Sequence, residues 1–200
     1  MFKNVVKDPS FWLLVAINTW CIYYYERHPE GFSTIVWLYW IQSVLLGMFN
    51  FLDLLTIKNP DPQSMTINDR PIDGSVKSRG CVAFFFLVHY QLFHFVYMIF
   101  LATMLKGRVD FIFLLMGTVA FLLGTLVQFI RHKRAEAGTK VNVGKMFILP
   151  YLRIVPMHLM ILGPAFLGWH TSTVFLLLKL MADALMYILT SPYSKPAATL

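Results

Sequence analysis

The feature of the sequence that most constrains the fold is the uncharged run from Cys81 to Leu105. Its 25 residues carry no formal charge, although His89, Gln91 and His94 lie within it. A helix of about 20 mainly apolar residues is long enough to cross the hydrocarbon core of a bilayer. Because 58% of the whole chain is hydrophobic, against roughly 45–50% in soluble proteins, the sequence predicts an integral membrane protein.

Comparable apolar segments recur along the chain and predict its architecture. We expect an all-α integral membrane protein, a bundle of six transmembrane helices that forms a single domain over residues 1–200. The predicted spans are residues 10–25, 33–57, 81–105, 110–130, 146–169 and 172–190. The segment 58–80 is rich in Pro, Asp, Ser and Gly, which favour turns, so it is predicted to be a polar loop in the cytoplasm.

Basic residues outside the predicted spans indicate the orientation. With six spans, both termini share one side of the membrane with the loops after spans two and four. That side carries twelve Lys and Arg residues, namely Lys3, Lys7, Lys58, Arg70, Lys77, Arg79, Arg131, Lys133, Arg134, Lys140, Lys145 and Lys195. The other side carries three, namely Arg27, Lys106 and Arg108. Since cytoplasmic loops are enriched in Lys and Arg, both termini are predicted to lie in the cytoplasm.

The formal net charge of +7 has the same explanation. The basic run 131–134 flanks the fourth predicted span, and anionic lipid headgroups at the cytoplasmic face are its expected partner. Nucleic-acid binding would need such residues on an extended soluble surface, which the sequence lacks. Membrane lipids, other membrane subunits or a second copy of the chain are therefore the predicted partners, and nucleic acid is not.

Ionisable side chains within the predicted spans form the candidate site. Each costs about 2.5–3.5 kcal/mol on insertion scales, so those that remain usually face the interior of a helix bundle. By the predicted orientation, five lie in the cytoplasmic half of the bilayer and form a candidate intramembrane polar cluster: Asp53, His89, Arg153, His158 and Asp183. Secondary polar positions are Gln42, Asn50, Tyr90, His94 and Lys179.

The pairing within this candidate cluster is open from the sequence. Arg153 can contact Asp53 or Asp183, or it can extend to the lipid headgroups at the inner surface. Lys179 stands four residues before Asp183 and can pair with it on the same helix face. These two pairings of Asp183 compete with each other.

The two histidines of the third span point in different directions on a regular helix. Five residues separate His89 from His94, which places their side chains about 140° apart around the helix, so they cannot bind one metal ion together. We expect His94 to share a face with Tyr90 and Tyr97, and His89 to turn inward toward the segment 153–158 of span five. No metal or haem is predicted, and the residues left as possible ligands are His89, His94 and His158.

The two cysteines are predicted to be free thiols. Cys21 and Cys81 fall near opposite faces of the membrane in the predicted topology. A disulfide needs Cα atoms within about 7 Å, whereas the hydrocarbon core is about 30 Å thick.

Three short patterns in the chain resemble those of a known family. They are YW-x-Q-x-x-x-x-G (Tyr39, Trp40, Gln42, Gly47), HY-x-x-F (His89, Tyr90, Phe93) and PY-x-RI-x-x-x-H (Pro150, Tyr151, Arg153, Ile154, His158). The chain resembles a family of bacterial and archaeal multi-pass membrane proteins catalogued only as a domain of unknown function. That resemblance implies a bacterial or archaeal cell membrane and no particular activity. Family members tend to have Glu at the position of Gln42 and Gly at that of Gln91, which weakens an acid–base role for Gln42.

Two functions remain open from the sequence. The first, which we prefer, is a non-enzymatic accessory or scaffold subunit, or a self-associating membrane protein, because the sequence contains no complete catalytic constellation. The alternative is a small intramembrane enzyme or transporter that uses the candidate polar cluster, with a metal or haem as a conceivable cofactor. No cofactor is predicted for the first function.

Overall fold

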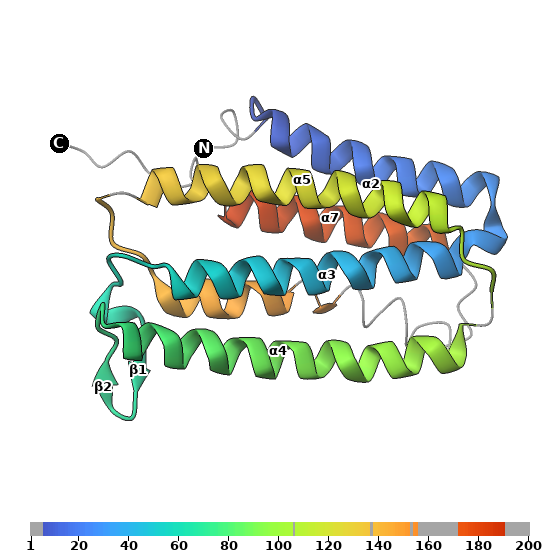
Figure 1. Cartoon of the computed structure of the whole chain (residues 1–200). Coiled ribbons are helices and arrows are strands. Elements are labelled where there is room, and N and C mark those ends of the chain that lie inside the picture. Colours follow the sequence, from blue (N-terminus) through green and yellow to red (C-terminus); the bar gives the residue numbers. More distant parts are fainter. Residues whose placement is uncertain (1–5, 106, 137, 153, 156–171, 191–200) are drawn as a thin grey trace.

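Long helices running side by side form the body of the structure, a computed structural model (Figure 1). It describes the chain except residues 1–5, 106, 137, 153, 156–171 and 191–200. The long helices are α2 (Pro9–Arg27), α3 (Phe32–Leu55), α4 (Val76–Met104), α5 (Phe111–Glu136) and α7 (Ser172–Thr190). A further apolar helix covers Val143–Leu152, in the segment predicted as span five.

Capping residues explain where two of the helices begin. The Asp8 carboxylate accepts a hydrogen bond from Ser10 N at 3.0 Å, and Pro9 occupies the first turn, so α2 begins directly after Asp8. Ser75 Oγ accepts from Ser78 N at 3.1 Å and starts α4 at Val76. The prediction that residues 58–80 are all loop is therefore wrong at its end, because Ser75 caps a helix there.

The remainder of the loop between α3 and α4 carries short elements. These are a 3₁₀ turn over Pro62–Ser64 and the strands β1 (Thr66–Ile67) and β2 (Arg70–Pro71). The strands pair antiparallel, with Thr66 opposite Pro71. Asn68 and Asp69 join them with φ values of 48° and 61°, the left-handed conformation that a tight hairpin turn requires. Another 3₁₀ turn, Pro29–Gly31, links α2 to α3.

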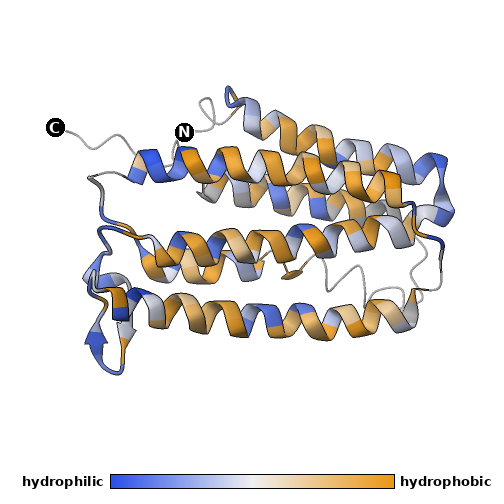
Figure 2. Cartoon of the chain, viewed as in Figure 1, coloured by the Kyte–Doolittle hydropathy of each residue, from blue (hydrophilic) through white to orange (hydrophobic). Residues whose placement is uncertain are grey.

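Within the described residues, three segments are long and apolar enough to cross a membrane. They are Pro29–Leu55, Val76–Thr103 and Phe111–Glu136. Apolar residues run along the helices, and hydrophilic ones collect at the hairpin and at the helix ends (Figure 2). Large apolar side chains also stand exposed on α4 and α5, among them Phe84, Val88, Leu92, Phe95, Ile112, Leu115, Val119 and Leu123. Such a surface suits a lipid environment better than water.

Helix α3 packs against α4 on one side and α5 on the other, while α2 packs against α7 and α5. The contact between α3 and α4 is close at Gly47, where an added Cβ would lie 2.5 Å from the ring of Tyr90. On the opposite side of α3, Cys21, Ile35, Leu38 and Leu176 form a fully buried apolar cluster between helices.

Polar contacts show that several helix ends meet at one end of the bundle. Arg131 Nη1, near the end of α5, lies 2.6 Å from Asp8 Oδ1. The hydroxyl of Tyr187, near the end of α7, donates to Asp8 Oδ2 at 2.7 Å. Lys133 Nζ lies 2.7 Å from Asp53 Oδ1 near the end of α3. We call this the basic end, because Lys58, Lys77, Lys133, Arg131 and Arg134 belong to it.

Candidate functional site

A buried ion pair lies at mid-height in the bundle. Lys179 Nζ is 2.6 Å from Asp183 Oδ2, one turn along α7. Their side chains are only 11% and 10% exposed to solvent. The sequence spacing permits this contact because residues four apart share a helix face. In the structure Lys179 is therefore a partner of Asp183.

Side chains from α2 and α3 surround the ion pair. Lys179 Nζ donates to Asn18 Oδ1 at 3.2 Å and to Gln42 Oε1 at 3.3 Å, and it lies 3.8 Å from the centre of the Tyr39 ring. Asn18 Nδ2 donates in turn to Asp183 Oδ2 at 3.3 Å. We call these five residues the central polar cluster. The cluster pairs one positive charge with one negative charge inside the bundle, where an unpaired charge would be very costly.

Gln42 brings an unsatisfied polar group into the central polar cluster. Gln42 is 3% exposed, and its Nε2 has no hydrogen-bond partner among the described residues. The amide orientation is well determined, because the cation Lys179 requires the carbonyl oxygen of Gln42 rather than its NH₂ group. The cluster therefore keeps a buried donor available beside the ion pair.

A small cavity lies beside the central polar cluster, on the side toward the basic end. Its volume is ≈ 30 Å³, and it lies between α2, α3 and α5, which is room for about one water molecule. Four polar side chains line it, namely Ser10, Asn18, Thr125 and Gln128. Asn18 belongs both to the cavity and to the cluster, and Ser10 neighbours the Asp8–Arg131 contact. Polar side chains thus occur along the cavity from Ser10 to Asn18, among apolar ones such as Leu13, Ile17 and Leu46.

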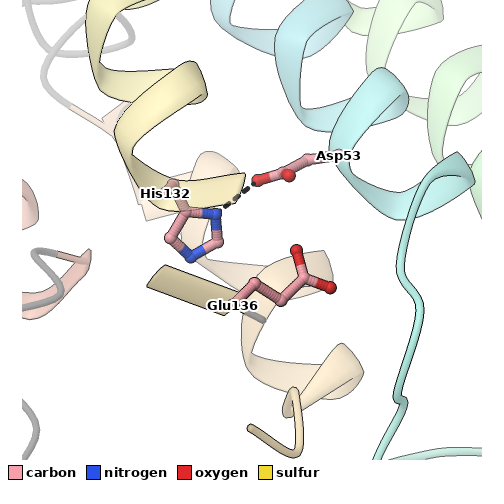
Figure 3. Close-up of side chains that lie close together, drawn as sticks. All are labelled: Asp53, His132 and Glu136. Atoms are coloured by element: carbon pink, nitrogen blue, oxygen red, sulfur yellow. Dashed lines mark ion pairs between the residues drawn. The ribbon is translucent and has the colours of Figure 1, made fainter. Parts of the chain in front are cut away.

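A second polar cluster lies at the basic end, where Asp53, His132 and Glu136 point toward one another (Figure 3). His132 Nδ1 is 3.1 Å from Asp53 Oδ2, and Lys133 Nζ lies between the carboxylates, 2.7 Å from Asp53 Oδ1 and 2.8 Å from Glu136 Oε2. Asp53 thus has basic partners from α5, namely His132 and Lys133, whereas its predicted contact with Arg153 lies outside the described residues. The physical reason is that α3 and α5 end side by side.

The histidines of α4 lie on different faces, but His89 is not turned inward. His94 is 1% exposed; its Nε2 lies 2.7 Å from Ser43 Oγ of α3, and Tyr90 shares that face. His89 is exposed, and its Nδ1 lies 2.7 Å from the Tyr151 hydroxyl. His89 thus contacts predicted span five, as expected, but at Tyr151 and on an exposed side of α4, because the buried face of α4 is the one that packs on α3.

The other residues singled out in the sequence are Arg153, His158, Asn50 and the two cysteines. Arg153 and His158 lie outside the described part of the chain. Asn50 is partly buried, and its Nδ2 has no described hydrogen-bond partner. Cys21 and Cys81 are both free, as predicted; the first is buried and the second exposed.

Sequence reasoning missed three residues that the structure places in polar clusters. Asn18 was overlooked because it is one uncharged amide in a short span. His132 was included in the basic run that flanks span four and Glu136 was not considered, although their spacing of four residues would have indicated a shared helix face. The predicted set comes together only in part, since Gln42, Lys179 and Asp183 meet, whereas Asp53 and His89 have other partners.

Comparison with known proteins gives the family. Residues 4–196 match the family of unknown function DUF6498. No curated protein and no solved structure matches the chain. The match covers nearly the whole length and agrees with the resemblance to a domain of unknown function, so the chain belongs to the DUF6498 family.

Proposed function

We propose that the protein is a multi-pass integral membrane protein with six spans and both termini in the cytoplasm of a bacterial or archaeal cell. Three apolar segments of spanning length support the membrane location. The gathering of Lys and Arg at the basic end supports the orientation, since this end then faces the cytoplasm and its anionic lipid headgroups.

Matched cysteine labelling tests this topology. On a background without Cys21 and Cys81, Thr139→Cys at the basic end and Glu30→Cys at the opposite end are treated with a membrane-impermeant maleimide. Intact cells should label Glu30→Cys only, and Thr139→Cys should react only after the cells are broken. Labelling of Thr139→Cys in intact cells would reverse the orientation.

We further propose that the protein is a small non-enzymatic carrier whose central polar cluster binds and releases a proton. The observation that supports this proposal is the Lys179–Asp183 pair, buried at mid-height beside a small cavity with which it shares Asn18. Ionisable residues retained inside membrane spans commonly mark ion pathways and proton relays. A proton that arrives through the cavity meets Asn18 first and then Asp183.

Protonation of Asp183 changes the balance of forces in the cluster. The neutral carboxyl no longer compensates Lys179, whose ammonium then keeps only amide oxygens and the Tyr39 ring as partners. A buried charge without a counter-ion is strongly destabilising, so α7 must shift or Lys179 must lose its own proton. Proton binding is thereby coupled to the position of α7 against α2 and α3.

Infrared spectroscopy of the purified protein in lipid tests the proton site directly. As the pH is lowered, the C=O band of a protonated carboxyl should appear in the wild type and be reduced in Asp183→Asn. Asp73→Asn, in the exposed loop, is the matched control and should keep the band. Identical pH-dependent spectra for the wild type and Asp183→Asn would contradict the proposal.

A second candidate function is an accessory or scaffold subunit that binds other membrane subunits, or a membrane protein that associates with further copies of itself. The observation that favours it is that Lys179 already has four internal partners, as expected of a static packing contact. In that case Asp183 stays ionised throughout the pH range of the infrared experiment, and the protein copurifies with a membrane partner from native membranes.

A further inference from the structure

The cluster at the basic end has the donor set of a metal site. Asp53, His132 and Glu136 each offer one ligand atom, and these three atoms lie within 4.8 Å of one another. They come from α3 and α5, two helices that pack together along their length. The ligands are therefore held by the framework of the bundle rather than by a loop, and Figure 3 shows all three side chains converging.

Two of the ligand atoms are shielded from water without forming a hydrogen bond. Asp53 Oδ1 and His132 Nδ1 are buried, and neither has a partner in hydrogen-bonding geometry among the described residues. Their close contacts are ion pairs: Asp53 Oδ1 lies 2.7 Å from Lys133 Nζ, and His132 Nδ1 lies 3.1 Å from Asp53 Oδ2. Buried polar atoms are nearly always hydrogen-bonded, so both atoms depend on these ionic contacts, and a bound cation would replace them.

The Lys133 ammonium occupies a position between the carboxylates in which a cation is surrounded by oxygen atoms. Its ammonium lies 2.7 Å from Asp53 Oδ1, 2.8 Å from Glu136 Oε2 and 3.1 Å from the Asp53 carbonyl oxygen. Three oxygens thus surround one positive charge. Lys has a long flexible stem, and its side chain is 21% exposed, so the ammonium can leave toward the solvent at the basic end.

We propose that Asp53, His132 and Glu136 bind a divalent transition-metal ion, of which Zn²⁺ and Mn²⁺ are representative, in competition with the Lys133 ammonium. One imidazole and two carboxylates suit this class of ion, since imidazole favours zinc-like metals and carboxylates favour manganese-like ones. The two carboxylate charges balance the +2 charge of the metal. The expelled Lys133 needs no counter-ion because it moves into water.

This site would join the ends of α3 and α5 to the adjoining loop. Glu136 Oε1 accepts a hydrogen bond from Lys58 N at 3.4 Å, so the segment after α3 is tied to the same carboxylate. The proposed metal site is separate from the central polar cluster, and its test does not depend on the carrier proposal.

Calorimetric titration of the full chain in detergent with Zn²⁺ tests the inference. We expect one ion per chain for the wild type, and at least about tenfold weaker binding for His132→Ala and for Glu136→Gln, because each loses a direct ligand. Lys133→Gln should bind Zn²⁺ more tightly than the wild type, since the competing ammonium is removed. His28→Ala, which alters the exposed His28–Glu30 pair at the opposite end, should bind like the wild type.

Thermal unfolding with and without Zn²⁺ separates weak binding from poor folding of the variants. Lys133→Gln should melt at a lower temperature than the wild type without metal, because two carboxylates lose their counter-ion, and should gain more stability from Zn²⁺. Equal Zn²⁺ affinity in the wild type, His132→Ala and Glu136→Gln would overturn the proposal. Absence of stoichiometric binding in both the wild type and Lys133→Gln would overturn it as well.

Discussion

Lys179 and Asp183 form their 2.6 Å ion pair within a single helix, while the groups that enclose them belong to two others. The charges therefore find each other locally, and only their hydrogen-bonding environment depends on tertiary packing. This division makes the contribution of the pair to stability separable from that of its surroundings.

Removal of one partner of this pair should be much more harmful than removal of both. Lys179→Met leaves the Asp183 carboxylate buried without a cation, and we expect a loss of about 3–5 kcal/mol in the free energy of unfolding. The double variant Lys179→Met/Asp183→Leu should recover a large part of that loss, because no charge remains buried. Equilibrium unfolding in mixed micelles gives both values; an equal loss in the single and double variants would contradict this account.

Acid should weaken the contact at the start of α2. Burial of Asp8 raises the pKa of its carboxyl, but the hydrogen bonds from Tyr187, Arg131 and Ser10 N–H, with the charge of Arg131, outweigh this and bring the pKa below its usual 3.8. The unfolded chain then binds a proton more readily than the folded one. The stabilisation is complete above the usual pKa and disappears as the pH falls through the lower folded pKa.

Asp8→Asn isolates this effect, since all other carboxylates remain. We expect the wild type to lose melting temperature faster than Asp8→Asn as the pH falls below about 4. Melting curves of both proteins over the range from neutral to acidic pH provide the comparison. Parallel pH profiles would show that the ionised Asp8 contributes nothing to stability.

The histidines of α4 should differ in their sensitivity to substitution. His94→Leu removes the buried contact to Ser43 and should cost about 1–3 kcal/mol, because the Ser43 hydroxyl loses a partner inside the bundle. His89→Leu should cost less, since His89 and its contact with Tyr151 are exposed. Unfolding of the two variants under identical conditions tests the order, and a larger loss for His89→Leu would refute it.

The periodicity of α4 was enough to separate these two side chains but not to say which one is buried. The approximate positions of the described helices, the free cysteines and the Lys179–Asp183 spacing follow from local sequence, because they depend on hydropathy and on the turn of a helix. The partners of Asp53 and Asn18 do not, since they depend on which helices lie side by side. Each polar residue in a span has several candidate neighbours at the same depth, and only packing selects among them.

Two glycines of the bundle should respond in opposite ways to alanine. Gly47→Ala places a methyl group 2.5 Å from the Tyr90 ring, and such overpacking typically costs about 1–3 kcal/mol. Gly80→Ala meets nothing within 4 Å and should stabilise α4 by about 0.5–1 kcal/mol through helix propensity. The change in the free energy of unfolding checks both signs, and a stabilised Gly47→Ala would mean that α3 and α4 are farther apart than described.

The packing of α2 against α7 has a consequence for how the protein is made. These are the first and last of the described helices, so a ribosome delivers α2 to the membrane well before its neighbour exists. Until α7 arrives, Asn18 has only the Leu14 carbonyl oxygen as a partner, and the Asp8 carboxylate lacks Tyr187. The bundle can close only after synthesis of α7, and a chain interrupted before that helix leaves Asn18 without Asp183 and Lys179, and Asp8 without Tyr187.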